Sequence, residues 1–259
     1  MHSEFLDRLL SGEINHDDSA YRQSMEKYGL LGEKAVAVID YKFDEKYLQT
    51  ENQAYHNDRV MRKMISLFER YFGKINYLNQ YNRQAFIISA DNTEEKDIVN
   101  TIRTIYNIFI KENKHVHVRI GIGEIAQGLE GLKKSYDQSR IARKTINKSG
   151  VMFYKELGIY QLLFYIDDTS KIDDYVKEIL NPLLIYDKKN NQNLIDTLRE
   201  YLKCGQNVSQ ASQNLYIHRN TMIKRVEKIE ELLGCSIKNA EVTNQLYNAV
   251  KIYDLFLKK

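Results

Sequence analysis

The stretch that most constrains the fold of this chain lies near its C-terminus, between residues 207 and 226. Its pattern predicts a short helix, a tight turn and a second helix. In the second helix an apolar residue recurs every three or four positions, at Met222, Val226, Ile229 and Leu233. Side chains at this spacing share one face, so that face must be buried against other helices. The stretch therefore predicts a compact helical unit with one outward-facing edge.

Two neighbouring segments supply helices for such a unit. Upstream, one apolar helical stripe ends near Gly205 and consists of Leu194, Ile195, Leu198, Tyr201 and Leu202. Downstream, the tail carries a heptad-like seam of Val242, Leu246, Ala249, Tyr253 and Phe256. The tail helix either pairs with a second copy of the chain or packs back onto the three-helix unit, which consists of the upstream helix and the two helices of residues 207–226. The pattern does not separate these two arrangements.

The outward edge of the second helix carries polar groups of several kinds. Asn220 and Lys224 fall opposite the apolar face. Arg219 lies near the helix start, and Thr221 and Ile223 lie on the two flanks. An amide pairs with adenine, cations pair with guanine or phosphate, and a hydroxyl and an apolar side chain suit a thymine methyl group. This combination indicates a helix that reads the DNA major groove, and the alternative is a charged surface helix in an ordinary bundle.

The composition excludes several classes of protein. The 259 residues are 43% hydrophobic and 28% charged, which is enough to bury one core or two. The chain has no apolar run of about 18 residues and no secretory signal pattern, so we expect a cytoplasmic protein without a membrane partner. The net charge of +3 is too small to establish a nucleic-acid partner by itself. Cys204 and Cys235 lack ligand-like neighbours, so we expect reduced thiols and neither a disulfide nor a metal.

The first part of the chain alternates strands with helices. Two short helices are expected at its start, over residues 4–10 and 21–28. The expected order is then strand 35–40, helix 60–71, a hairpin of strands 75–80 and 85–89 with a polar tip at 81–84, helix 93–113, strand 116–123, helix 131–147 and strand 151–154. This order predicts an α/β sandwich in which helices cover the faces of a mixed sheet.

This order of elements resembles the GGDEF-type diguanylate cyclase fold. In that family a carboxylate at the end of the first strand and a second carboxylate in the hairpin hold two metal ions. Here the candidate first-strand acid is Asp40, while residues 82–86 read Asn-Arg-Gln-Ala-Phe, with Gln84 in place of the hairpin acid. Two-metal phosphoryl chemistry needs both carboxylates. We therefore expect a degenerate GGDEF-like domain without a catalytic residue, a metal or a cofactor.

Three other features of the chain suggest ligand sites at first sight. The glycines of segment 121–128 resemble a phosphate loop, but their spacing fits no nucleotide-binding fingerprint, and a strand that ends in a turn explains them. His115 and His117 share one strand face without a spaced carboxylate or cysteine, and solvated or core histidines explain them. The acidic pairs at 167–168 and 173–174 are explained by a solvated loop and a helix start.

The only proline of the chain, Pro182, marks the expected junction between the two parts. A helix is predicted from Ile172 to Leu180. Proline disfavours helical geometry in the residue that precedes it, so this helix is expected to end at Pro182.

Six segments of the C-terminal part form a specific pattern, and they are residues 183–187, 198–202, 207–211, 215–222, 225–229 and 231–234. The pattern resembles the C-terminal helix-turn-helix of PucR-type regulators, the purine-catabolism and sugar-diacid activator family. Its most specific part is His218-Arg219-Asn220-Thr221. Such regulators carry a degenerate GGDEF-like domain ahead of the helix-turn-helix, and residues 121–123 and 136–144 fit its closing strand and helix. The resemblance implies an α+β chain, with a GGDEF-like α/β sandwich followed by an all-α domain.

The resemblance also implies four segments along the chain. They are N-terminal linker helices (1–30), a degenerate GGDEF-like domain (31–157), a helical connector (158–190) and a helix-turn-helix DNA-binding domain (191–259).

The resemblance implies DNA contacts from six side chains of the second helix. Those expected to read bases or contact nearby phosphates are Arg219, Asn220, Thr221 and Lys224, and those expected to position phosphates are Arg225 and Lys228. His218 is expected to cap and orient the helix. One such unit reads only a few base pairs of double-stranded DNA, so we expect a homodimer on half-sites about 34 Å apart or a multiple of that distance.

The sequence thus predicts a DNA-binding transcription regulator, and specifically an activator. The alternatives reside in the GGDEF-like domain, which is either a sensor for an unidentified nucleotide or metabolite effector or a residual nucleotide cyclase.

Overall fold

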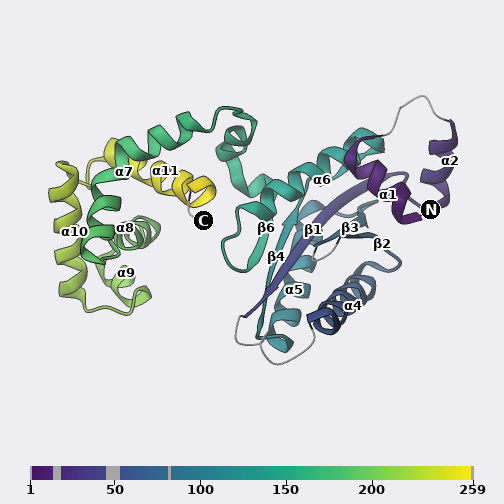
Figure 1. Ribbon diagram of the computed structural model, residues 1–259, viewed down its shortest axis with the longest axis horizontal. Helices are drawn as coiled ribbons and strands as arrows, with labels where there is room; N and C mark the ends of the chain where they lie inside the picture. Colours follow the sequence, from purple (N-terminus) through teal and green to yellow (C-terminus); the bar gives the residue numbers. More distant parts are fainter. Residues whose placement is uncertain (1, 14–18, 45–52, 81–82, 258–259) are drawn as a thin grey trace. The chain divides into compact units, whose positions relative to one another are not determined.

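The computed structural model describes residues 2–13, 19–44, 53–80 and 83–257 (Figure 1). The chain divides into two compact units, residues 1–164 and 165–259. Residues 81–82 of the expected hairpin tip lie outside the described residues, and the rest of that tip, residues 83–84, belongs to a strand.

The first unit is built on a six-stranded mixed sheet. Its strands are β1 (Glu33–Phe43), β2 (Asn76–Gln80), β3 (Arg83–Ser89), β4 (Val116–Ile122), β5 (Ala126–Gln127) and β6 (Gly150–Phe153). The order is β2-β3-β1-β4-β6, and β5 pairs with β1. Only the β4–β6 pairing is parallel, and the other pairings between the described strands are antiparallel. The expected mixed sheet and hairpin are confirmed.

Helices cover both faces of this sheet (Figure 1). The helices of the first unit are α1 (His2–Ser11), α2 (Ser19–Lys27), α4 (Gln53–Phe72), α5 (Glu95–Glu112) and α6 (Gly128–Lys144). Alternate residues of β1 feed two cores, because successive strand side chains point to opposite faces. Ala37 and Ile39 pack with α4 and α5, whereas Val36 and Val38 pack with α1 and α6. Strand β1 is therefore buried on both sides, which makes the predicted α/β sandwich.

The glycines near the end of β4 let α6 approach the sheet. A Cβ atom at Gly121 would lie 2.0 Å from the backbone oxygen of Ser139, and one at Gly123 would lie 2.0 Å from that of Ser135. Ser135 also accepts a hydrogen bond through Oγ from the backbone N–H of Val36, at 3.0 Å. Close packing of helix on strand therefore accounts for these two glycines, in addition to the expected strand end.

The carboxylate of Asp40 is bound by two arginines on the α6 side of the sheet. Arg119 donates to it from Nε at 2.8 Å and from a terminal nitrogen at 2.7 Å, and Arg143 of α6 contacts the same carboxylate. The side chains of Asp40 and Arg143 are only 9% and 6% exposed. Burial lowers the pKa of both arginines. Asp40 lies within β1, three residues before the end of the strand, and not at its end. Because two arginines bind its carboxylate, Asp40 serves as the anion of an ion-pair cluster.

The second unit is helical. After β6 a 3-10 segment, η1 (Tyr154–Tyr165), leads to α7 (Ser170–Asn190), α8 (Leu194–Lys203), α9 (Val208–Asn214), α10 (Arg219–Leu233), α11 (Ala240–Ile252) and a π-helical turn, η2 (Tyr253–Leu257). This order matches the expected helices, with one exception at Pro182.

The expectation that Pro182 ends a helix is wrong, because α7 continues through it to Asn190. The helix buries Leu180 before the proline and Leu183 after it, and it packs against α8, α10 and α11. Pro182 itself is exposed. The burial of leucines on both sides of the proline therefore outweighs the one backbone hydrogen bond that a proline removes.

The tail helix packs back onto its own unit, which is one of the two arrangements left open by the sequence. In α11 Leu246 and Ala249 are buried, and the helix contacts α7 and α8. Asp254, just after α11, accepts two hydrogen bonds from Arg199 of α8, at 2.7 and 2.8 Å. The heptad-like seam is therefore an intramolecular contact.

We predict that Asp40→Ala lowers the free energy of unfolding by about 3–5 kcal/mol, because it leaves two partly buried guanidinium groups without their shared anion. Urea denaturation measures this change. The matched control is Asp137→Ala, which removes an exposed carboxylate that pairs with Lys133 at 3.0 Å on α6, and it should cost less than about 1 kcal/mol. Equal losses in the two variants would contradict the assigned role of Asp40.

We predict that Asp91→Asn removes part of the pH dependence of stability in acid. Asp91 accepts hydrogen bonds from the Ser89 hydroxyl, the backbone N–H of Glu33 and the Lys34 ammonium, and these bonds lower its pKa from 3.8 to about 2. A depressed carboxyl pKa contributes stability that is present above about pH 4 and is lost as the pH falls towards 2. The difference in unfolding free energy between wild type and variant should therefore shrink between pH 5 and pH 3 in urea titrations. A constant difference would argue against these bonds.

Candidate nucleic-acid interface

The short helix α9 is capped and then turned sharply into α10. Asn207 caps α9, and its Oδ1 accepts a hydrogen bond from the backbone N–H of Gln210 at 3.1 Å. After α9, the backbone N–H of Ile217 donates to the carbonyl of Ser212 at 3.0 Å. The residue between the helices, Tyr216, has a φ of 55°, the left-handed conformation that closes such a turn. These bonds set the direction in which α10 begins.

The recognition candidate α10 is held by its cap and its inner face. His218 is the N-cap residue, and its Nδ1 accepts a hydrogen bond from the backbone N–H of Asn220 at 3.2 Å. Met222 and Ile229 are completely buried, while Val226 and Leu233 are half-buried. The apolar face expected from the sequence is therefore the buried face of the helix, and it contacts α7, α8 and α9.

Four of the expected DNA-contacting side chains lie together on the opposite edge of α10. Arg219, Asn220, Thr221 and Lys224 are all exposed. Within the part of the chain that the structure describes, none of these side chains makes a hydrogen bond or ion pair. Their amide, hydroxyl and cationic groups are thus available to a partner outside the chain, next to the exposed N-terminus of the helix.

The other two expected contacts, Arg225 and Lys228, are engaged within the unit. Arg225 is half-buried and donates to the Thr197 hydroxyl of α8 at 3.2 Å. Lys228 lies 2.8 Å from a carboxylate oxygen of Glu231 and 5.4 Å from the ring centroid of Tyr186. The hydrogen bond to Glu231 is the main cause of its raised pKa. Both cations therefore have intramolecular partners, which the sequence analysis did not identify.

The exposed surface of α9 adds polar side chains that the sequence analysis did not single out. Ser209, Gln210 and Gln213 are exposed on this helix, six to ten residues before the start of α10. The available signal was the Asn207 cap, which fixes where α9 begins and hence which of its residues face outward.

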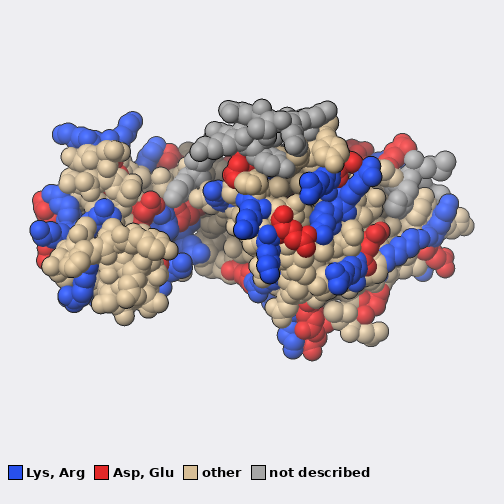
Figure 2. All heavy atoms as spheres, turned by 90° about the horizontal axis from the view of Figure 1, so that it is seen from below, with Lys and Arg blue, Asp and Glu red and all other residues tan. Residues whose placement is uncertain are grey.

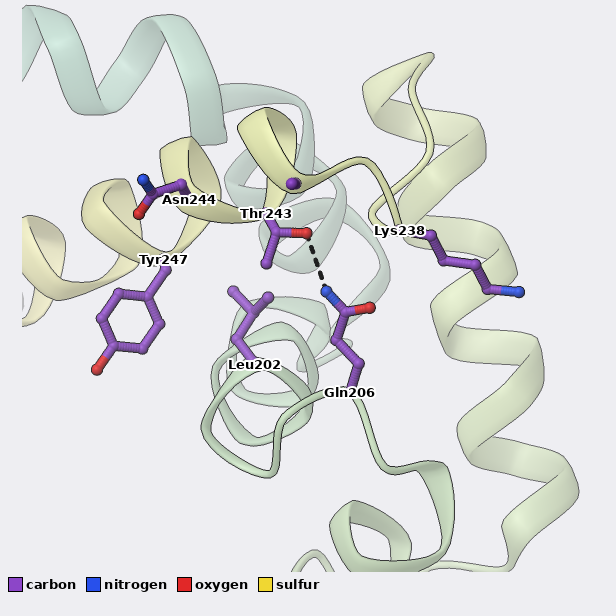
Figure 3. A pocket seen from close by; sticks show the side chains of 7 residues that line it. Leu202, Gln206, Lys238, Thr243, Asn244 and Tyr247 are labelled. Atoms are coloured by element: carbon purple, nitrogen blue, oxygen red, sulfur yellow. Dashed lines mark hydrogen bonds between the residues drawn. The ribbon is translucent and has the colours of Figure 1, made fainter.

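A groove lies elsewhere on the second unit, between α8, α11 and the loop before α11 (Figure 3). Its volume is about 460 Å³, and its lining includes Leu202, Gln206, Lys238, Asn244 and Tyr247. Gln206 donates from Nε2 to the Thr243 hydroxyl at 2.9 Å (Figure 3). The same nitrogen donates to the carbonyl of Ile237 at 3.2 Å. The central polar group of the groove is therefore committed to bracing the loop on α8.

The histidines and the acidic residue Asp168, which suggested ligand sites in the sequence, have hydrogen-bond or ion-pair partners within the chain. His117 lies 2.7 Å from Asp44, and His115 lies 3.8 Å from the same carboxylate. Among the described residues no group of three or more histidine, cysteine or acidic side chains is placed to hold a metal ion. Asp168 accepts two hydrogen bonds from Ser170 at the start of α7. In the ranges that the structure covers, no helix is both long and apolar enough to cross a membrane.

Two protein-family models match the chain. The model of the GGDEF-like domain matches residues 12–145, and that of the PucR C-terminal helix-turn-helix domain matches residues 194–252. The second match includes α8, α9, α10 and α11 up to Ile252.

Three curated relatives come from Bacillus subtilis (strain 168). The DNA-binding transcriptional activator AdeR is 22% identical over 96% of this chain and 58% of its own length. The proline-responsive transcriptional activator PutR is 30% identical over 55% of this chain and 34% of its own length. The purine catabolism regulatory protein is 43% identical over 26% of this chain and 13% of its own length. The chain thus spans less than two thirds of the length of each relative.

The GGDEF-like match covers half of the chain, and the helix-turn-helix match coincides with the capped pair of helices that exposes Arg219 and Asn220. This chain therefore belongs to the PucR family, with a GGDEF-like domain followed by a PucR C-terminal helix-turn-helix domain.

Proposed function

We propose that this chain is a sequence-specific DNA-binding regulator that activates transcription and acts in the cytoplasm. The N-terminal turn of α10 enters the major groove of double-stranded DNA. The observation that carries the proposal is the exposed edge of Arg219, Asn220, Thr221 and Lys224, which sits on a helix whose other face is buried. Activation is supported by two relatives that are named as transcriptional activators.

Each chemical group on this edge has a counterpart in the groove. Asn220 matches the hydrogen-bond donor and acceptor of adenine, and Arg219 matches guanine or a phosphate. Lys224, one turn further on, supplies a second cation, and Thr221 supplies a hydroxyl. Arg225 and Lys228 are weaker contributors in this account, because part of their bonding capacity is already used inside the unit.

The basic groups that support the helical unit as the DNA-contacting part are the exposed side chains of Arg219 and Lys224 on α10. On the face seen in Figure 2, lysines and arginines of the first unit are interspersed with acidic side chains, without one continuous basic track. DNA tracks on a protein surface are usually basic stripes or patches. One helix-turn-helix unit contacts a few base pairs, so the functional form is a homodimer on half-sites about 34 Å apart or a multiple of that distance.

The GGDEF-like domain in this account has no cyclase activity. Asp40, the candidate metal-binding acid, is paired with two arginines, which disfavour a cation at the same carboxylate. Gln84 is buried and donates to Asn79 at 3.0 Å, and a neutral amide cannot replace the second carboxylate. The relatives are transcription regulators by name. Dimerisation or the binding of a small-molecule effector is the role left to this domain.

We predict that Arg219→Ala and Asn220→Ala each weaken binding to a selected operator by about 1–3 kcal/mol without changing the fold, because both side chains are exposed. Fluorescence anisotropy with operator and random duplexes measures the loss, and circular dichroism checks the fold. An Asn220→Ala chain that keeps wild-type affinity for both duplexes would refute the assignment of Asn220.

We predict that Lys224→Ala weakens binding to operator DNA and to random DNA to a similar degree. Lys228→Ala should also weaken binding to both DNAs similarly, but by less than Lys224→Ala does. Loss of one phosphate-neutralising cation reduces the slope of log affinity against log salt by about 1. Lys224 has no intramolecular partner among the described residues, whereas Lys228 is held by Glu231. A larger slope change for Lys228 than for Lys224 would contradict the structural ranking.

We predict that the full chain, incubated with GTP and Mg²⁺, forms no cyclic dinucleotide detectable by chromatography. Asp40→Ala and wild type should give the same background signal, since Asp40 is bound to arginines and takes no part in catalysis. A cyclic dinucleotide formed by the wild-type chain would overturn this account of the GGDEF-like domain.

A further inference from the structure

Four residues other than glycine adopt a left-handed backbone conformation in the described part of the chain. They are Asn92, Asn191, Gln206 and Tyr216, with φ between 49° and 65°. Asparagine tolerates this conformation, because its short polar side chain bonds locally. A bulky residue does not, since its Cβ atom crowds the backbone. Gln206 and Tyr216 therefore need another reason for their positions.

Gln206 has its reason inside the protein. Its amide donates to the hydroxyl of Thr243 in α11 (Figure 3) and to the carbonyl of Ile237, and so it connects the end of α8 to α11 and to the loop before it. These bonds offset the strain of its backbone.

Tyr216 has no such reason inside the protein. Its side chain is 95% exposed, more than that of any other large hydrophobic residue in the part of the chain that the structure describes. In the ranges that the structure covers, the ring and the hydroxyl make no hydrogen bond and no ring contact. The turn itself is held by backbone bonds, at 3.1 Å from Tyr216 to Gln213 and at 3.0 Å from Ile217 to Ser212. A glycine would make the same backbone bonds with less strain.

The position of Tyr216 suggests what the exposed ring serves. It lies two residues before His218, the cap of α10, and three before Arg219, the first residue of the exposed edge. A helix that enters the major groove brings its preceding turn towards the sugar-phosphate edge of that groove. A phenol is a neutral donor on a flat apolar body, and side-chain hydroxyls of this kind are common phosphate contacts.

We propose that Tyr216 is a further DNA contact, and that its hydroxyl donates a hydrogen bond to a backbone phosphate at the edge of the groove occupied by α10. The inference rests on the proposed DNA binding and extends it by one residue. The backbone strain is the stability cost of placing a phenol, in place of glycine, at this turn. Because the contact is to a phosphate, it positions α10 on the duplex and does not read sequence.

The test compares Y216F and Y216G with wild type in the full chain. Y216F should weaken binding to operator and random duplexes equally, by about three- to tenfold, because one hydrogen bond is lost. The salt dependence of its affinity should keep the wild-type slope, because a neutral phenol releases no counterion. Y216G should bind at least as weakly as Y216F, while its melting temperature stays the same or rises by a few degrees, on the order of what relief of such strain gives.

The matched control is Y247F, which removes the hydroxyl of a tyrosine on α11 that is 41% exposed. It should bind both duplexes like wild type. Sedimentation at the concentrations of the binding assay should give the same oligomeric state for all variants.

Three results would overturn the inference. They are wild-type affinity of Y216F for both duplexes, a fall in the melting temperature of Y216G, and a loss of affinity that follows from a changed oligomeric state, which would place the ring between copies of the chain. A wild-type chain that binds no DNA would refute the proposed function, and with it this inference. Wild-type binding together with an unaffected Y216F would refute this inference alone.

Discussion

The burial of one face of α10 is the constraint on which the rest of the second unit depends. Met222 and Ile229 have no exposed surface, so the helix cannot rotate without opening the contacts to α7, α8 and α9. The cap by His218 fixes the first turn from the other end. The edge that begins at Arg219 is therefore held in one orientation by the buried face and the cap of the helix.

The first unit reuses a sandwich architecture without its expected chemistry. Arg119 and Arg143 neutralise the carboxylate of Asp40, the residue that the sequence suggested as a metal ligand. The three side chains form a structural ion-pair cluster. The close approach of α6 over Gly121 brings Arg143 to that position. The same residues that argue against phosphoryl transfer thus hold the helix on the sheet.

Much of this architecture could be predicted from the sequence because it depends on local periodicity. The apolar repeat of α10, the hairpin and the strand–helix order are of this kind. Three features were missed because they depend on tertiary contacts. Pro182 lies inside a helix stabilised by buried leucines, Lys228 lies over the ring of Tyr186 of another helix, and Asp44 meets His117 from 73 positions away. The strain at Tyr216 is likewise a backbone property that composition does not reveal.

The central claim is that the exposed edge of α10 selects DNA sequence. Selection of bound duplexes from random DNA, followed by sequencing, tests it most directly when wild type and Asn220→Ala are selected in parallel. The account predicts that wild type enriches a motif of two related half-sites and that the variant keeps the motif but loses its preference at one base pair of each half-site. The same motif from both chains, or no motif from wild type, would contradict it.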